Sequence, residues 1–249
     1  MEIILASGSP RRKHLMIDMD FSVQVKPLNI DEKLPPGLPA RKAALYVAQK
    51  KGAAAKKKWG TEKCILAADS LVILENKALS KPLHPAEAME MLRRLSGKVH
   101  EVHTAFHLQY KDQLIAQRVI SKVTMDHISE KEAKYYVDRY EPYDKAGSYA
   151  IQEWVGHCKV KKIEGSYTNI VGLPTYQVYR AISRCRRWAC PAAMRRVGPF
   201  RSSVPEKACG FSRDPLLRRG PPGTSRLRPP AAKKNATAKN SRSAFIPMK

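Results

Sequence analysis

The sequence lacks a long apolar run and a regular arrangement of cysteines. The only apolar run near its start covers residues 3–6, and basic residues follow at 11–13, so the run is too short for a signal peptide or a membrane span. The five cysteines show neither the even count nor the CxxC spacing of a disulfide framework or a zinc site. We therefore expect a cytoplasmic protein without a membrane partner, in which Cys64 and Cys158 are buried thiols.

Acidic residues are also scarce, and they are scarcest in residues 183–249. The chain of 249 residues has 46 Lys and Arg against 22 Asp and Glu, which gives a net charge of +24. Residues 183–249 contain 17 basic and 2 acidic side chains, a charge of +15, which leaves +9 for residues 1–182. Nine of the 18 prolines also fall in this last segment, a composition that cannot bury a core. We predict a folded domain over 1–182 and a disordered basic tail over 183–249.

The predicted tail has two interpretations. Its charge suits binding to nucleic acid, although no aromatic stacking platform is interleaved with the basic residues. The alternative is an extension that has no dedicated partner. The abrupt change of composition near Ile182 also raises the hypothesis of a shifted reading frame.

Residues 1–182 alternate between strand-like and helix-like patterns, which predicts an α/β domain with a mixed twisted sheet flanked by helices. Strands are expected at 2–6, 63–68, 71–74, 99–110, 114–125, 147–152, 157–163 and 167–171. Helices are expected at 10–19, 39–58 and 85–96, and another, with a capping box formed by Ser129 and Glu132, should reach Tyr140. Gly97 is placed to end the third helix in a left-handed conformation, and the two long strands around residues 111–113 predict a β-hairpin.

The segment from Ser7 to Arg12 joins the first strand to the first helix and is a candidate anion site. Ser9 is expected as the N-cap and Pro10 at the first helical position, so several backbone N–H groups point outward. Arg11 and Arg12 lie in the first turn, where the helix dipole disfavours positive side chains by roughly 0.3–1 kcal/mol. A bound polyphosphate would reverse that penalty. The alternative is an ordinary helix start with two solvated arginines.

Asp69 follows the apolar strand expected at 63–68, and it is a candidate catalytic carboxylate. Carboxylates at the carboxyl ends of strands face the crevice where α/β proteins bind ligands. The alternative is an aspartate that caps a turn. A nucleotide hydrolase needs a divalent metal to neutralise the phosphates and a carboxylate to bind that metal or deprotonate water, and Glu32 is the next candidate metal ligand after Asp69.

Isolated basic residues and histidines are less specific signals. Lys51, Lys81 and Lys145 are candidate phosphate contacts, although a solvated lysine is the commoner case. His100, His103 and His107 share one predicted strand. Because His100 and His103 point to opposite faces of that strand, we expect no metal ion shared by these histidines.

Six motifs in chain order together resemble one known family, the Maf proteins, which are nucleoside-triphosphate pyrophosphatases. The segments that carry the resemblance are S-G-S-P-R-R at 7–12, A-D-S at 68–70, S-K-P at 80–82, L-S-G-K-V-H-E-V-H-T at 95–104, D-K-A-G-S-Y-A-I-Q at 144–152 and I-E-G-S-Y-T-N-I-V-G-L-P at 163–174. The resemblance covers residues 3 to about 182. It implies two lobes around a nucleotide cleft, Mg²⁺ or Mn²⁺ as cofactor, and cleavage of a nucleoside triphosphate to a monophosphate and pyrophosphate.

The resemblance also implies roles for individual residues. Asp69 matches the catalytic acidic position of the family, while Arg11, Ser70 and Gln152 match the positions that tune base choice in the branch acting on dTTP and UTP. A glutamine amide suits this choice, because it donates to a carbonyl of uracil or thymine and accepts from N3–H. Arg12 is then the candidate phosphate clamp.

Other candidates match cleft positions of the family. The remaining residues that we expect to contact phosphate or metal are Ser7, Ser9, Glu32, Lys51, Lys81 and Lys145.

Three departures from the family pattern accompany these matches. Ser70 replaces a threonine and keeps its hydroxyl, and Ser80 replaces a glycine, which matters if that position needs a positive φ. The closing helix begins at Thr175, but its apolar periodicity is expected to end near Ile182. The family also implies a homodimer. An alternative function is a non-catalytic protein with a damaged C-terminal fold that binds nucleotides or nucleic acid.

Overall fold

The computed structural model describes residues 2–189, with side chains as far as Cys185. Its strands are β1 (Ile3–Leu5), β2 (Val23–Val25), β3 (Cys64–Leu74), β4 (Lys77–Leu79), β5 (Val99–Tyr110), β6 (Gln113–Met125) and β7 (Val160–Glu164). Its helices are α1 (Pro10–Asp18), α2 (Ala40–Trp59), α3 (Pro85–Leu95), α4 (Glu130–Tyr140), α5 (Trp154–Lys159), α6 (Tyr167–Val171) and α7 (Thr175–Ala189), with short 3₁₀ turns at Pro142–Asp144 and Ala146–Ser148. None of these helices has both the length and the hydropathy needed to cross a membrane.

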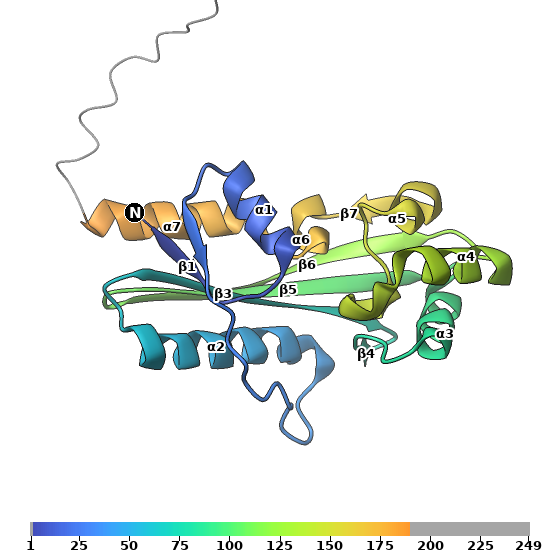
Figure 1. Cartoon of the computed structure of the whole chain (residues 1–249), viewed down its shortest axis with the longest axis horizontal. Coiled ribbons are helices and arrows are strands. Elements are labelled where there is room, and N and C mark those ends of the chain that lie inside the picture. The colour runs from blue at the N-terminus through green and yellow to red at the C-terminus, as the bar shows by residue number, and fades with distance from the viewer. Residues whose placement is uncertain (1, 190–249) are drawn as a thin grey trace, which may run out of the picture. The chain divides into compact units, whose positions relative to one another are not determined.

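The strands form one mixed sheet in the order β2-β1-β3-β5-β6-β7, with β4 paired to β3. The first three strands are parallel, and β5, β6 and β7 continue the sheet antiparallel to their neighbours. The parallel part is apolar on both faces. Ile3 and Leu5 pack toward α1 and α7, and Ile4 packs toward α2 on the other face (Figure 1). The predicted α/β fold with a mixed sheet flanked by helices is therefore confirmed.

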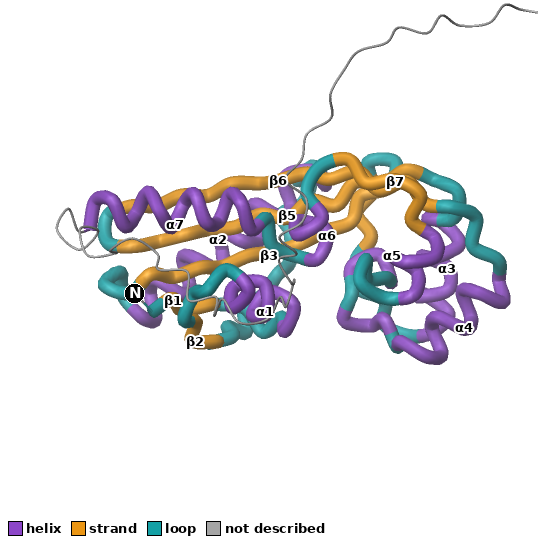
Figure 2. Tube along the Cα trace, turned by 90° about the horizontal axis from the view of Figure 1, so that it is seen from above, coloured by secondary structure: helices purple, strands orange, loops and turns teal. Residues whose placement is uncertain are grey.

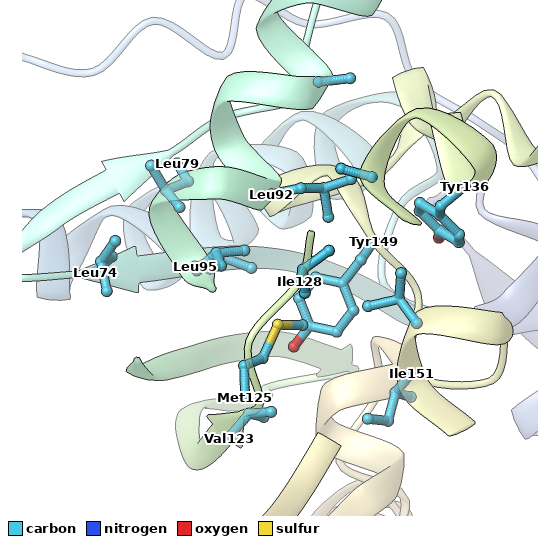
Figure 3. Packing of buried hydrophobic residues seen from close by; sticks show 14 of the residues in the cluster. Leu74, Leu79, Leu92, Leu95, Val123, Met125, Ile128, Tyr136, Tyr149 and Ile151 are labelled. Carbon is cyan, nitrogen blue, oxygen red and sulfur yellow. The ribbon is translucent and has the colours of Figure 1, made fainter. Parts of the chain in front are cut away.

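Two groups of helices lie at opposite ends of the long strands, as Figure 2 shows. One group, α1, α2 and α7, covers the parallel part of the sheet. The other group, α3, α4 and α5, surrounds a second core, in which Leu92, Leu95 and Tyr136 are completely buried (Figure 3). Strands β3, β5 and β6 pass through both ends, so the protein has the two predicted lobes on a shared sheet.

The outer edge of β3 is left open between the lobes. β1 pairs with β3 over Cys64–Leu66, and β4 pairs with it over Val72–Leu74, both on the edge opposite to β5. No described strand pairs with the residues between these two stretches on that edge. The sheet thus contains a gap one strand wide, and Asp69 lies in the middle of it.

Local sequence signals account for several elements. The side chain of Ser129 accepts from the N–H of Glu132, whose carboxylate returns to Ser129, so the capping box at the start of α4 is confirmed. Gly97 ends α3 with φ of 69°. The two long strands form the predicted hairpin with residues 111–112 as its turn.

Some predicted elements are wrong. Residues 147–152 form a 3₁₀ turn and an irregular loop, because Gly147 and Ser148 both have positive φ and cannot continue a strand. The segment predicted as a strand at 167–171 is helix α6, capped by Ser166, whose side chain accepts from the N–H of Asn169. At 157–163 the chain completes α5 before β7 begins. Short apolar segments of this kind do not distinguish strand from helix.

Two further predictions need correction. Cys158 is exposed, because it lies on the outer side of the short helix α5, whereas Cys64 is buried as expected. Helix α7 continues to Ala189, and Cys185 is buried in the apolar core that α7 shares with β5, so the apolar periodicity reaches at least Cys185. The predicted tail otherwise lies outside the described residues, as does the hypothesis of a shifted reading frame.

Candidate functional site

A cavity of about 340 Å³ occupies the gap at the edge of β3. Every residue that the sequence nominated as a site residue lines it. These residues are Ser7, Ser9, Arg11, Arg12, Glu32, Lys51, Asp69, Ser70, Lys81, Lys145 and Gln152. They come from both lobes and from segments up to 145 positions apart in the sequence, so the fold brings together what the motifs suggested. Their individual roles stay predictions.

The loop between β1 and α1 enters the cavity at a helix start. Ser9 is the N-cap residue, but its side chain caps no backbone N–H, and Pro10 occupies the first turn. The first turn carries no acidic side chain that would satisfy the free N–H groups. This end of α1 therefore keeps backbone donors for an anion.

Arg12 is a structural anchor of the cavity wall. Its side chain is only 9% exposed. Its Nε donates to the carbonyl oxygen of Gly172 at 2.8 Å, and its two terminal nitrogens donate to the Oγ atoms of Ser7 and Ser70, each at 2.9 Å. Burial lowers the pKa of Arg12, while the carboxylate of Asp69 opposes that shift. One guanidinium thus ties α1 to β3 and to the loop after α6.

Asp69 and Ser70 are neighbours on β3 and point to opposite faces of the sheet. Asp69 faces α2, where Lys51 Nζ donates to its Oδ1 at 2.9 Å. Ser70 faces α1, where its Oγ accepts from Arg12 and lies 2.9 Å from Thr104 Oγ1. The prediction that Asp69 ends a strand is wrong, since β3 continues to Leu74. The side chains on both faces of β3 reach the cavity because the edge of the strand is open at these residues.

The ammonium group of Lys51 forms ion pairs with two carboxylates. Its Nζ lies 2.7 Å from Glu32 Oε1 and 2.9 Å from Asp69 Oδ1. The next residue, Gly52, lets α2 approach β5, because a Cβ at this position would lie 2.1 Å from Cδ2 of His107. The close approach of the helix therefore fixes the lysine that joins the two candidate metal ligands.

The opposite wall carries an ion-pair chain that the sequence reasoning missed in part. Arg11 Nη1 lies 3.1 Å from Asp144 Oδ2, and Lys145 Nζ lies 2.8 Å from the other oxygen of Asp144 and 3.4 Å from Glu153 Oε1. Burial raises the pKa of Asp144, but the hydrogen bond and charge of Lys145 and the charge of Arg11 outweigh it and hold that pKa below its usual value. Asp144 stood in a recognised motif, but Glu153 had no signal of its own.

The wall of the cavity also has apolar members. Val72, Val102 and Ile151 line it, and Gln152 presents a buried Oε1 that has no hydrogen-bond partner among the described residues. Tyr149 closes the wall, with its hydroxyl 2.6 Å from His100 Nε2. An unpaired buried acceptor is costly, so this oxygen is ready to accept from a ligand.

The other candidates are placed as follows. Lys81 is exposed at the rim and forms no ion pair with a described residue. Ser80 has no positive φ, so the serine in place of the family glycine causes no backbone strain. No three His, Cys, Asp or Glu side chains converge into a metal site within residues 2–189. His100 contacts Tyr149, whereas His103 contacts Glu101 on the other face of β5.

Comparison with known proteins places the chain. The family model described as Maf-like protein matches residues 2–185. A protein of Bacteroides fragilis named dTTP/UTP pyrophosphatase is 42% identical over 184 residues, which cover 74% of this chain and 95% of that protein. A protein of the same name from Porphyromonas gingivalis is 40% identical over 184 residues, covering 73% and 92%. The solved dITP/XTP pyrophosphatase of Mycobacterium abscessus aligns over 77% of this chain and 98% of its own, with 13% identity and a TM-score of only 0.35. The chain belongs to the family of Maf-like proteins.

Proposed function

We propose that this protein is a nucleoside-triphosphate pyrophosphatase that hydrolyses dTTP and UTP to the nucleoside monophosphate and pyrophosphate. The observation that carries the proposal is the mixed lining of the cavity. The wall combines apolar side chains and the unpaired Oε1 of Gln152 with basic side chains such as Lys51 and the free N–H groups of α1. The relatives named dTTP/UTP pyrophosphatase support the choice of substrate.

The basic residues of the cavity suit the triphosphate. Lys81 and Lys145 face the cavity together with Lys51, so several positive charges surround one volume. Lys145 is now paired with Asp144, and a phosphate oxygen would compete for the same donor. Arg12 supports the site by fixing Ser7 rather than by standing free, and Arg11 is kept as a residue for base choice.

Asp69 is the proposed general base. It would accept a proton from the water that adds across the α–β anhydride bond, and the bond between the α and β phosphates breaks with pyrophosphate as leaving group. Lys51 lies 2.9 Å from Asp69 Oδ1 and orients that carboxylate. A positioned base of this kind contributes about 10²–10⁴-fold to a rate.

We propose Mg²⁺ or Mn²⁺ as cofactor, held by Glu32 and Asp69. These two carboxylates already converge on one cationic group, the ammonium of Lys51. Two carboxylates completed by substrate phosphate oxygens are a typical donor set for Mg²⁺. When bound, the ion would neutralise phosphate charge and lower the pKa of a bound water.

The apolar part of the wall, together with Gln152, suits uracil and thymine. The amide oxygen of Gln152 would accept from N3–H of the base, and the amide nitrogen would donate to a neighbouring carbonyl. Cytosine presents the opposite pattern, an acceptor at N3 and a donor at N4, and would pair with Gln152 only after the amide group turns over. A site that holds the amide in one orientation therefore discriminates against cytosine.

The test is a product assay over the common nucleoside triphosphates, with and without Mg²⁺ or Mn²⁺. We expect pyrophosphate from dTTP and UTP, and a loss of at least about 100-fold in kcat for Asp69→Asn with nucleotide binding retained. Asp112→Asn, in the exposed turn of the β5–β6 hairpin, is the matched control and should leave kcat unchanged. Release of orthophosphate, or a fully active Asp69→Asn enzyme, would refute the proposal.

A second copy of this chain is a further partner that we propose. We propose a homodimer in the cytoplasm, and the edge of β6 over Gln113–Val119, which no described strand covers, is one surface open to a second copy. Sedimentation equilibrium of the full chain tests this, and a monomer at all concentrations contradicts it.

Binding of nucleic acid by residues 183–249 concerns mainly residues that the structure does not describe. Filter binding of DNA by the full chain and by a chain ending at residue 189 tests it.

A further inference from the structure

The residue that selects the base lies at the corner of a tight turn. The N–H of Glu153 donates to the carbonyl oxygen of Ala150 at 3.1 Å, which closes a turn with Ile151 and Gln152 at its two central positions. The side chain of Gln152 therefore points wherever this turn directs it. No regular strand or long helix holds residues 150–153, so other contacts must fix the turn.

One buried hydroxyl contacts both ends of that turn. Tyr136 Oη accepts from the N–H of Ala150 at 3.1 Å, and it donates to Glu153 Oε2 in a short hydrogen bond. Tyr136 lies on α4 and is completely buried in the core of the second lobe (Figure 3). A single atom anchored in a packed core thus holds the first and last residues of the turn.

Two further contacts restrict the same turn. Glu153 Oε1 lies 3.4 Å from the Nζ of Lys145, a side chain only 9% exposed. Gly156, on α5, lies directly behind the turn, and a Cβ at this position would come within 1.8 Å of the carbonyl oxygen of Ile151. The carboxylate of Glu153 is therefore shared between Tyr136 and Lys145, a candidate phosphate contact.

We propose that Tyr136, acting through Glu153, is a positioning residue that aims Gln152 at the base and so sets the discrimination between uracil or thymine and cytosine. The inference rests on the proposed function. Tyr136 and Glu153 are not among the residues that line the cavity, so we expect neither to touch the nucleotide. Their effect on base choice would pass through the turn, whereas the contact of Glu153 with Lys145 concerns the candidate phosphate contacts.

The variant that isolates the hydroxyl is Tyr136→Phe. It keeps the ring in the core and its stacking on Tyr140, whose ring centroid is 4.9 Å away. It leaves the N–H of Ala150 and Oε2 of Glu153 without their partner. The measured quantity is the ratio of kcat/KM for UTP to kcat/KM for CTP, and we expect this ratio to fall about tenfold, the value of roughly one hydrogen bond.

Three matched variants give the test its specificity. Tyr140→Phe, the same change one turn along α4, should leave the ratio as in the wild type. Glu153→Gln retains an oxygen that accepts from Tyr136, so it should lower the UTP to CTP ratio less than Glu153→Ala does. The double variant Tyr136→Phe/Gln152→Ala should have the same ratio as Gln152→Ala alone, because Tyr136 acts through Gln152.

The outcomes separate the two levels of the proposal. A wild-type enzyme that prefers UTP, combined with a Tyr136→Phe ratio equal to the wild-type ratio, overturns the inference and leaves the pyrophosphatase proposal standing. An equal loss on UTP and CTP also overturns it, because that result is a general structural effect. A wild-type protein that releases no pyrophosphate from any triphosphate overturns both.

Discussion

Gly52 offers a test of how α2 is held against the sheet. A Cβ added to Gly52 would lie 2.1 Å from Cδ2 and 2.3 Å from Cγ of His107, which is itself buried on β5. Ordinary carbon contacts are about 3.5 Å, so the ring or the helix must move by about 1.4 Å in Gly52→Ala. Overpacking of this kind costs about 1–3 kcal/mol. We expect the free energy of unfolding to fall by that amount.

The effect of Gly52→Ala on the free energy of unfolding should change sign when the His107 ring is absent. In a His107→Ala background the clash is removed, and alanine is favoured over glycine in a helix interior by about 0.5–1 kcal/mol. The coupling energy of the double-mutant cycle should therefore be about 1.5–4 kcal/mol, measured by urea unfolding of all four proteins. The pyrophosphatase activity should follow, because Lys51 precedes Gly52 and contacts Asp69. If Gly52→Ala costs the same in both backgrounds, the close contact does not position α2.

Three further predictions concern single residues. Burial lowers the pKa of His100 from 6.5 to about 4, so between these pH values only the unfolded state binds a proton at this histidine. The free energy of unfolding should therefore drop by up to about 3 kcal/mol from pH 7 to pH 4. In His100→Gln the drop over the same pH range should be much smaller. Arg12→Lys cannot reach three acceptors and should lose at least about 2 kcal/mol of stability in urea unfolding, and a loss below 0.5 kcal/mol would contradict the anchoring role. Gly156→Ala must displace the turn at Ile151 and should lower the UTP to CTP ratio, whereas a wild-type ratio would show that α5 does not support the turn.

Elements with a local cause could be predicted from the sequence. The capping box of Ser129 and Glu132 and the stop at Gly97 depend on residues within one or two turns of each other, and both were correct. The strand predictions at 147–152 and 167–171 were wrong because such short segments do not distinguish a strand from a helix or turn, and contacts with distant residues add to the local ones. Asn169, for example, donates to the carbonyl oxygen of Val102 and to Ser121 Oγ, which lie far away in the sequence.

The members of the candidate site could be predicted, but their partners could not. Motif resemblance nominated residues such as Asp69 and Gln152, and all of them line one cavity. That Arg12 is fully engaged by protein acceptors, or that Asp144 pairs with Arg11, depends on distances across the fold. Tyr136 gave no signal, because a tyrosine on the apolar face of a helix is first of all a core residue.

The position of Asp69 shows why the cavity lies where it does. A carboxylate in the middle of a central strand would lose its hydration, and burial without a partner is expensive. The cost is avoided here because β1 is only three residues long and β4 pairs with β3 only from Val72 onward, which leaves five residues of β3 unpaired after the β1 pairing ends. Between them β3 has an open edge, so Asp69 and Ser70 reach the same cavity from opposite faces of one strand. A longer β1 would close the gap and bury the carboxylate, and the shortness of that strand is therefore part of the site.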